Sequence, residues 1–314
     1  MMEGGTTIKL LDLPGQQVSE WLRSFDTVLS DGDGTIWQDD TEIEGAAAVL
    51  NALQNHHGKR VYIITNNGLK TRSELFGRAQ HLGFQVPNDQ HIISPTATIV
   101  EHLKQLPDFD SSKHKVYVVG NAAIGRELRE NGIESYGAGV EEPLAKGDKW
   151  QDFAMRELTK PEAADNVGAV VVGWDEHFSY CKMARACHIL CRNENSAFLV
   201  TNRDAVHKYP NFCIPGTGAF VAGIEACAGR EALEMGKPNP VVLEPLIQSG
   251  ALRPQRTLMI GDCPKMDIAF ARNCGMQSLL VGTGSFPLDI LQQNSHLPQP
   301  DFYLPKLGDL LQFL

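Results

Sequence analysis

The chain has 314 residues, which is enough for one large core or, as we expect, a core with a second domain. Its net charge of −10 and its lack of a dense Lys/Arg block argue against nucleic acid or an anionic membrane as a partner. We also find no membrane span or signal-like start, and the seven scattered cysteines suit reduced thiols, so we expect a cytoplasmic protein.

The first hundred residues alternate between predicted helices and strands. An amphipathic helix is expected up to about residue 24, followed by a buried strand over Phe25–Leu29 and a helix over Glu44–Gln54. A second buried strand, Val61–Ile64, precedes a helix over residues 71–82. This alternation predicts an α/β fold with a parallel, doubly wound sheet.

The middle of the chain continues the pattern with what looks like a separate set of strands. These are expected at Val116–Val119, Ala169–Val172 and Phe198–Thr201, with helices over residues 122–131 and 179–191. We expect residues 137–160 to form an irregular loop. The predicted organisation is a core over residues 1–95, an inserted α/β domain over 96–212, and a return to the core over 213–314.

The returning segment is predicted to complete the first sheet. Helices are expected over residues 219–227, 241–248 and 307–313. Strands are expected over Thr257–Ile260 and Met276–Val281. The segment Gly282-Thr-Gly284 is interpreted as the exit of the second of these strands.

The sequence Asp31-Gly-Asp-Gly-Thr35 comes directly after the first predicted strand. Asp-Gly pairs are common in solvated turns, so alone the segment is better explained by a turn. Two neighbouring carboxylates at the end of a buried strand, however, repel each other unless a hard cation such as Mg²⁺ binds them. In that case Asp31 can act as a nucleophile and Asp33 as a general acid and base.

Two more predicted strands end in polar groups, Thr65-Asn66-Asn67 and Asp262. Because the carboxyl ends of parallel strands share one edge of a sheet, these groups are expected to meet Asp31 and Asp33 there. Asp31, Asp262 and the main-chain carbonyl of Asp33 can offer oxygens to Mg²⁺. Thr65, nearby amides and Lys237 can bind phosphoryl oxygens, which is what phosphoryl transfer requires.

These motifs resemble those of the haloacid dehalogenase superfamily of phosphatases. Asp31-Gly-Asp-Gly-Thr looks like its first motif, Thr65-Asn-Asn its second, Lys237 its third and Gly261-Asp262 with Asp267 its fourth. From about residue 20 onward the chain is similar to the phosphoglycolate and pyridoxal-phosphate phosphatases, long described as 4-nitrophenylphosphatases. The segments that carry this closer likeness are Thr65–Arg72, Val172–Tyr180, Pro215–Gly218, Gly236–Pro238 and Pro300–Tyr303.

The resemblance implies a Rossmann-like core, a large C2-type cap between the second and third motifs, Mg²⁺ dependence and a homodimer formed through the cap. It implies a small phosphorylated metabolite as substrate, such as phosphoglycolate, glycerol phosphate or pyridoxal phosphate. Thr65, Asn66, Asn67 and Lys237 would bind the phosphoryl group, and Asp267 would orient Lys237 or a water on the metal. His207 lies where the pyridoxal-phosphatase version carries a substrate-binding histidine.

The fourth motif departs from the pattern of the family. Cys263 stands in place of an arginine, and Lys265 in place of an acidic residue beside the metal ligand. A catalytically weakened relative that binds a phosphometabolite or a protein partner is therefore the alternative. Dehalogenation on the same fold does not need Asp33, so the presence of Asp33 argues against that reaction. Phosphomutase activity stays open as an alternative.

Overall fold

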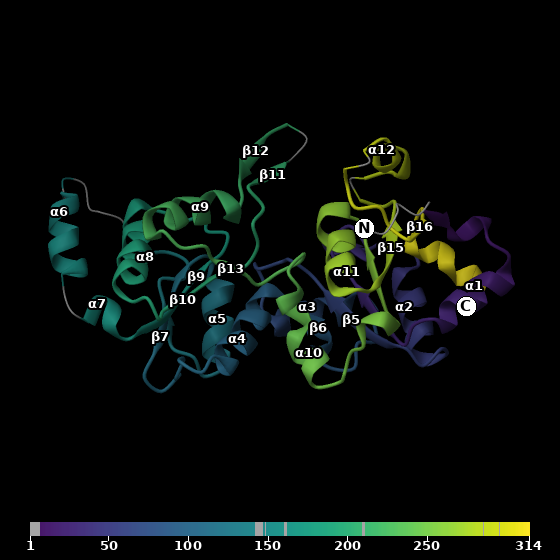
Figure 1. Cartoon of the computed structure of the whole chain (residues 1–314), viewed down its shortest axis with the longest axis horizontal. Helices are drawn as coiled ribbons and strands as arrows, with labels where there is room; N and C mark the ends of the chain where they lie inside the picture. Colours follow the sequence, from purple (N-terminus) through teal and green to yellow (C-terminus); the bar gives the residue numbers. More distant parts are fainter. Residues whose placement is uncertain are drawn as a thin grey trace. The chain divides into compact units, whose positions relative to one another are not determined.

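The computed structural model describes residues 7–141, 147, 149–159, 162–208, 211–284, 286–294 and 296–314. It divides into two compact units, whose elements are labelled in Figure 1. The first unit comprises the chain up to Thr65, Ser73–Ile93 and Lys237–Leu314, and the second comprises Asn66–Arg72 and Ser94–Gly236. The second unit is thus an insertion into the first.

The first unit is built on a seven-stranded sheet in which all neighbouring strands are parallel. The chain moves from β2 to β5 and β6 on one side, and from β14 to β15 and β16 on the other. The order therefore reverses between β2 and β14, which is where ligands bind in sheets of this kind. From edge to edge the strands are β1 (Ile8–Lys9), β16 (Phe302–Leu304), β15 (Gln277–Val281), β14 (Thr257–Gly261), β2 (Thr27–Ser30), β5 (Arg60–Ile64) and β6 (Ile92–Ile93).

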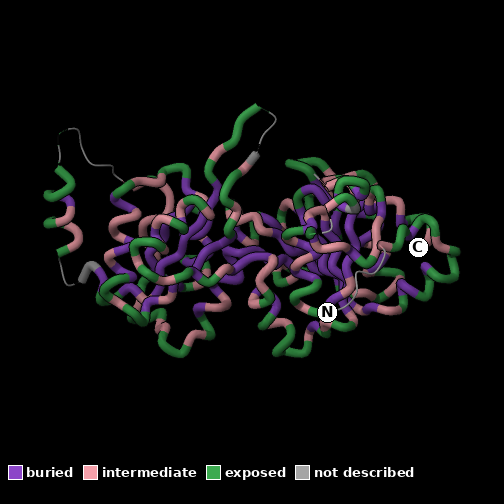
Figure 2. The backbone as a smooth tube through the Cα atoms, turned by 45° about the horizontal axis from the view of Figure 1, so that its top comes forward, coloured by how far each residue is buried: buried purple, intermediate pink, exposed green. Residues whose placement is uncertain are grey.

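Alternate residues of the central strands pack on opposite faces of this sheet, as the two-residue period of a strand requires. Val28 packs in the cluster formed with α1 (Gly15–Arg23), α2 (Ala46–Asn55) and α3 (Arg72–His81). Its neighbour Leu29 packs instead with α11 (Ala269–Cys274) and the 3-10 helix Pro240–Leu243. The strands are consequently buried on both faces (Figure 2), which explains their continuous apolar sequences.

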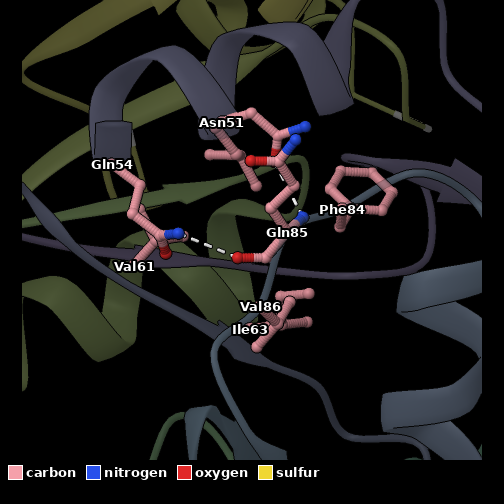
Figure 3. A pocket seen from close by; sticks show the side chains of 8 residues that line it. Asn51, Gln54, Val61, Ile63, Phe84, Gln85 and Val86 are labelled. Carbon is pink, nitrogen blue, oxygen red and sulfur yellow. Dashed lines mark hydrogen bonds between the residues drawn. The ribbon is translucent and has the colours of Figure 1, made fainter. Parts of the chain in front are cut away.

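A small hollow beside α2 holds a network of amide side chains (Figure 3). Gln54 donates a hydrogen bond to the carbonyl of Gln85 at 2.8 Å, and the N–H of Gln85 donates to Asn51 at 2.8 Å. The cavity volume is about 10 Å³, which leaves room for about one water molecule. The hollow is therefore too small for a substrate.

The second unit has its own five-stranded parallel sheet, in the order β13 (Leu233–Glu234), β10 (Ala197–Val200), β9 (Val167–Val172), β7 (Lys115–Val119) and β8 (Ser135–Tyr136). Helices α8 (Tyr180–Arg192) and α9 (Thr217–Ala228) pack against buried residues of β7, β9 and β10. Helices α4 (Pro95–Gln105) and α5 (Ala122–Glu130) belong to the same unit, as does the hairpin of β11 (Val206–Lys208) and β12 (Cys213–Pro215).

The remaining elements are short. They are the hairpin of β3 (Trp37–Gln38) and β4 (Thr41–Glu42), helices α6 (Trp150–Phe153), α7 (Glu162–Asp165), α10 (Glu244–Gln248) and α12 (Leu288–Gln293), the π-helical turns Ala154–Leu158 and Pro264–Ile268, and the 3-10 helices Leu10–Asp12, Asp89–His91, Pro254–Arg256 and Leu307–Phe313. In the described part of the chain, no helix combines the length and the apolar character needed to cross a membrane.

The fold class is as predicted, but the inserted unit ends later than expected. The sequence placed its end at residue 212, whereas the second unit continues to Gly236. The reason is that α9 packs on the second sheet through Val221 and Ile224, and β13 pairs with β10. The segment expected to be an irregular loop, residues 137–160, contains α6 and a π-helical turn; residues 142–146, 148 and 160 of it lie outside the described part.

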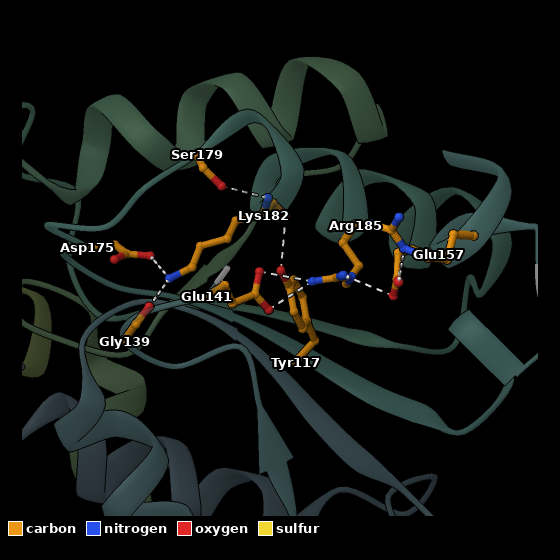
Figure 4. Close-up of polar contacts among 9 residues, drawn as sticks. Tyr117, Gly139, Glu141, Glu157, Asp175, Ser179, Lys182 and Arg185 are labelled. Atoms are coloured by element: carbon orange, nitrogen blue, oxygen red, sulfur yellow. Dashed lines mark hydrogen bonds and ion pairs between the residues drawn. The ribbon is translucent and has the colours of Figure 1, made fainter. Parts of the chain in front are cut away.

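Buried ion pairs tie the second unit together (Figure 4). The ammonium of Lys182 donates to Asp175 at 2.6 Å and to the carbonyl of Gly139, and both side chains of the pair are 0% exposed. Nearby, Arg185 binds both carboxylate oxygens of Glu141 at 2.9 Å and contacts Glu157 at 3.3 Å. These contacts hold α8 against the segments that precede it.

Lys182→Met should destabilise the second unit by about 3–5 kcal/mol, because it leaves the Asp175 carboxylate buried without its counter-charge. The matched control is Lys115→Met, which breaks the exposed pair with Glu134 and should cost no more than about 1 kcal/mol. Urea unfolding followed by circular dichroism compares the two. Equal losses would show that the buried pair has no special role in stability.

Candidate active site

The first polar groups of the site follow the two central strands of the first sheet. Asp31 comes directly after β2, and its N–H donates to the carbonyl of Ile260 in β14 at 2.8 Å. Asp262 comes directly after β14 itself. Gly34 then turns the chain with a φ of 86°, a conformation that favours glycine. Both carboxylates therefore start from adjacent strand ends, where the strand order reverses.

Lys237 bridges two carboxylates of this site. Its ammonium donates to Asp31 and to Asp267 at 2.6 Å each, and to the carbonyl of Ile64 at 3.2 Å. The second oxygen of Asp267 accepts the N–H of Cys263 at 2.9 Å. The side chains of Lys237 and Asp267 are only 2% and 1% exposed. Asp267 therefore orients Lys237 directly, which was one of the two roles predicted for it.

Asp31, Asp262 and Asp267 form a cluster of carboxylates within the described part of the chain. Each offers an oxygen within 4.8 Å of the others. The hydroxyl of Thr35 lies between two of them, 3.2 Å from Asp262 and 3.5 Å from Asp31. Thr35 was not predicted, because a threonine after an Asp-Gly turn has no distinctive signal in a single sequence.

The electrostatics of the cluster are unbalanced. Burial raises the pKa of Asp31 well above its usual range, and burial together with the charge of Asp267 raises the pKa of Asp262. Burial acts to lower the pKa of Lys237, but the charges of Asp267 and Asp31 outweigh it and hold that pKa above the ordinary lysine value. Three carboxylates thus face one ammonium among the described groups of the cluster.

The chemistry of these donors fits a divalent hard cation. The three carboxylates carry two more negative charges than Lys237 can neutralise. Carboxylate oxygens are also the ligands that Mg²⁺ prefers. Bringing in such a cation would offset the repulsion that raises the pKa of Asp31 and of Asp262. Asp31 and Asp262 are the available ligands, because Asp267 is already bound to Lys237 and to the chain at Cys263.

Asp33 lies outside the three-carboxylate cluster and has a different environment. Its side chain is 43% exposed, and one oxygen, Oδ1, accepts hydrogen bonds from Trp37 Nε1 at 3.1 Å and Arg78 Nη1 at 3.2 Å. The sequence did not single out either donor. Trp37 lies two residues after the Asp31–Thr35 motif, and Arg78 lies within the helix predicted over residues 71–82.

Two glycines allow the buried carboxylates to approach the backbone. A Cβ on Gly284 would lie 1.8 Å from Asp262 Oδ2, and one on Gly261 would lie 2.2 Å from the carboxyl carbon of Asp267. Next to Gly284, the hydroxyl of Thr283 donates to the carbonyl of Gly34 at 2.6 Å. The segment Gly282-Thr-Gly284 thus does more than end a strand, contrary to its interpretation from sequence.

The remaining predicted residues divide between the two units. Thr65 is buried at the carboxyl end of β5, in the first unit, and its N–H donates to the carbonyl of Ile93 at 3.0 Å. Asn66 and Asn67 belong to the second unit, and so does His207, which pairs with Ile214 in the β11–β12 hairpin. Their roles toward a phosphoryl group or substrate stay predictions.

The two unusual residues of the fourth motif leave the Lys237 contacts in place. Burial raises the pKa of the Cys263 thiol to about 11, so this thiol is protonated at neutral pH. Cys263 binds Asp267 through its main-chain N–H, which does not depend on the side chain. Lys265 is exposed at the start of the π-helical turn Pro264–Ile268.

Comparison with known proteins identifies the family. Residues 28–134 match the family model described as haloacid dehalogenase-like hydrolase, and residues 234–310 match a second HAD-hydrolase-like model. A glycerol-3-phosphate phosphatase from Gallus gallus is 35% identical, with 96% of each chain covered. Chronophin from Homo sapiens is 33% identical over 96% of this chain and 97% of its own. Phosphoglycolate phosphatase 2 from Arabidopsis thaliana is 32% identical over 93% and 94%.

Solved structures share the fold. A 4-nitrophenylphosphatase from Thermotoga maritima has a TM-score of 0.72 at 24% identity, covering 93% of this chain and 98% of its own. A glycerol phosphate phosphatase from Mycobacterium tuberculosis, solved in complex with magnesium, has a TM-score of 0.69 at 21% identity, covering 92% and 77%. With two family models and full-length relatives in agreement, the chain belongs to the haloacid dehalogenase-like hydrolases and is a phosphoric monoester hydrolase of that family.

Proposed function

We propose that this phosphatase depends on Mg²⁺ and hydrolyses small phosphomonoesters through an aspartyl-phosphate formed on Asp31. The observation that carries the proposal is the bridge from Lys237 to Asp31 and Asp267, set beside Asp262 at the carboxyl edge of the sheet. In the proposed reaction, this arrangement would supply the nucleophile, a fixed cation and two oxygens for the metal from one cluster. Phosphoryl transfer depends mostly on such positioning and charge stabilisation.

In the first step, a carboxylate oxygen of Asp31 forms a bond to phosphorus while the bond from phosphorus to the ester oxygen breaks. Asp33 gives its proton to that leaving oxygen, so the alcohol departs neutral. In the second step, Asp33 takes a proton from the water that attacks phosphorus. The bond between phosphorus and Asp31 then breaks, releasing inorganic phosphate and restoring the enzyme.

The other residues prepare these steps. Lys237 favours the ionised, nucleophilic form of Asp31, which burial alone would protonate, and Thr65 is proposed to bind a phosphoryl oxygen. Asp31, Asp262 and the main-chain carbonyl of Asp33 would hold the ion. When bound, Mg²⁺ supplies positive charge to the phosphoryl oxygens. The magnesium complex of the M. tuberculosis relative supports this choice of ion.

The names of the relatives support a small metabolite as substrate. They include glycerol-3-phosphate and phosphoglycolate phosphatases, and the sequence resemblance adds pyridoxal phosphate. We propose this class of phosphomonoesters as substrates, and His207, Asn66 and Asn67 as residues that contact them. The homodimer through the cap likewise stays a proposal.

The alternative of a catalytically weakened relative depends on Cys263 and Lys265. Neither substitution removes a group that the proposed reaction uses, because the N–H of Cys263 holds Asp267 and the contacts of Lys237 and Asp262 are made. This supports an active enzyme.

Asp31→Asn should lower kcat for 4-nitrophenyl phosphate by at least about 10³-fold, because an amide cannot form the covalent intermediate. The fold should survive, because Lys237 keeps its second carboxylate partner, Asp267, at 2.6 Å. The matched control is Asp26→Asn at the other end of β2, where the carboxylate binds exposed Arg256 and Arg253. It should retain activity. Undiminished hydrolysis by the Asp31 variant would refute the proposed nucleophile.

Gly284→Ala should raise the Mg²⁺ concentration needed for half-maximal activity at least tenfold, because the new Cβ displaces the Asp262 carboxylate. A tenfold change corresponds to about 1.4 kcal/mol of binding energy. Gly15→Ala serves as control, because a methyl group at Gly15 would meet no atom within 4 Å, and it should leave the Mg²⁺ dependence unchanged. The same Mg²⁺ requirement in both variants would argue against Asp262 as a ligand.

A further inference from the structure

We propose that Arg78 and Trp37 are positioning residues for Asp33, and that they determine how well the enzyme protonates poor leaving groups. This inference rests on the proposed function, in which Asp33 is the general acid. It concerns two side chains that the proposed reaction does not otherwise use. The carboxylate of Asp33 is the most exposed acidic group of the site.

Among the described residues, the donors to the Asp33 carboxylate bind one of its two oxygens. Trp37 Nε1 and Arg78 Nη1 donate to the same oxygen, Oδ1, at 3.1 and 3.2 Å. With Oδ1 held by two donors, the direction in which the other oxygen, Oδ2, points is defined. A carboxylate that is 43% exposed would otherwise rotate freely in water.

Both donors are themselves fixed. The Trp37 ring is fully buried, and it lies so close to Gly32 that a Cβ there would be 2.8 Å from it. A backbone bond from Gly34 to the carbonyl of Trp37, at 2.8 Å, closes the turn that carries Asp33. The turn that carries Asp33 is therefore fixed against the ring of Trp37.

Arg78 extends from α3 to the turn that carries Asp33 and to Trp37. Its side chain is only 9% exposed, and its guanidinium carbon lies 4.7 Å from the centre of the Trp37 ring. Stacking on an aromatic ring restrains a guanidinium in addition to its hydrogen bonds. Asp40 offers a weaker contact at 3.8 Å and is 92% exposed, so Asp33 is the principal partner of Arg78.

A stabilising role does not explain this arrangement well. Ion pairs with an exposed carboxylate contribute little to stability. Holding a catalytic carboxylate in one orientation, by contrast, has a large effect on rate, because misplacement of a reacting group is costly. The effect should appear only where the proton of Asp33 is needed.

Two esters with different leaving groups distinguish a positioning role of Arg78 and Trp37 from a stabilising role. An alkoxide leaves only if it is protonated, whereas 4-nitrophenolate is stable without a proton. For both esters kcat/KM reports the step in which the alcohol or phenol departs, and it does not depend on how fast the second step is. The ratio of the two values therefore measures proton donation by Asp33.

The experiment compares kcat/KM for glycerol phosphate and 4-nitrophenyl phosphate in Arg78→Met, Arg78→Lys and Trp37→Phe. We expect Arg78→Met to lower the value for glycerol phosphate at least tenfold and that for 4-nitrophenyl phosphate less than threefold. Arg78→Lys, which keeps a cationic donor, should recover much of the loss. Trp37→Phe keeps a buried ring without the N–H, so it should shift the ratio in the same direction.

The reference and control variants make the result specific. Asp33→Asn should show the same selective loss to a greater extent, and Arg60→Met, an exposed arginine at the opposite end of β5, should not change the ratio. The inference would be overturned if Arg78→Met and Trp37→Phe lowered kcat/KM equally for both esters. It would also be overturned if kcat/KM for glycerol phosphate did not fall, and in both cases the proposed function would stand. Hydrolysis of neither ester by the unmodified enzyme would overturn both.

Discussion

The contact between the Lys237 ammonium and the carboxylates of Asp31 and Asp267 is the interaction on which the site depends. Three acidic side chains are withdrawn from water at the end of a buried sheet, and such charges are tolerated only when paired and hydrogen-bonded. Lys237 satisfies two of them. The arrangement still carries excess negative charge, which fits a divalent cation and supports the proposed site for Mg²⁺ and a phosphoryl group.

The four acidic residues of the site differ in environment, and these differences support the roles proposed for them. Asp267 is 1% exposed and bound on both oxygens, so it holds Lys237 and is not free to react. Asp31 is 11% exposed and keeps an oxygen toward the cluster, as a nucleophile must. Asp33, at 43%, can exchange protons with substrate and water. Separating acid, base and nucleophile by environment is a general means by which one site performs several kinds of proton and bond chemistry.

Much of this could be predicted from sequence because it follows from local patterns. Strands such as β2, β5 and β14 are continuous apolar segments, and their shared carboxyl edge brings Asp31, Asp262 and Lys237 together. The missing parts depend on contacts between distant segments. Nothing local distinguishes Arg78 from other helical arginines or Gly284 from a strand exit. Likewise, a helix over residues 219–227 is evident from sequence, but not the sheet that it covers, and so the end of the inserted unit was misplaced.

We propose that the carboxylates beside Lys237 form a site for one divalent ion. A crystal structure grown with Mn²⁺, which substitutes for Mg²⁺ in oxygen-ligand sites and is located by its anomalous scattering, tests this directly. We expect a single strong peak at bonding distance, about 2.0–2.3 Å, from carboxylate oxygens of Asp31 and Asp262. A map with no peak between these two residues, or with its strongest peak elsewhere in the chain, would contradict it.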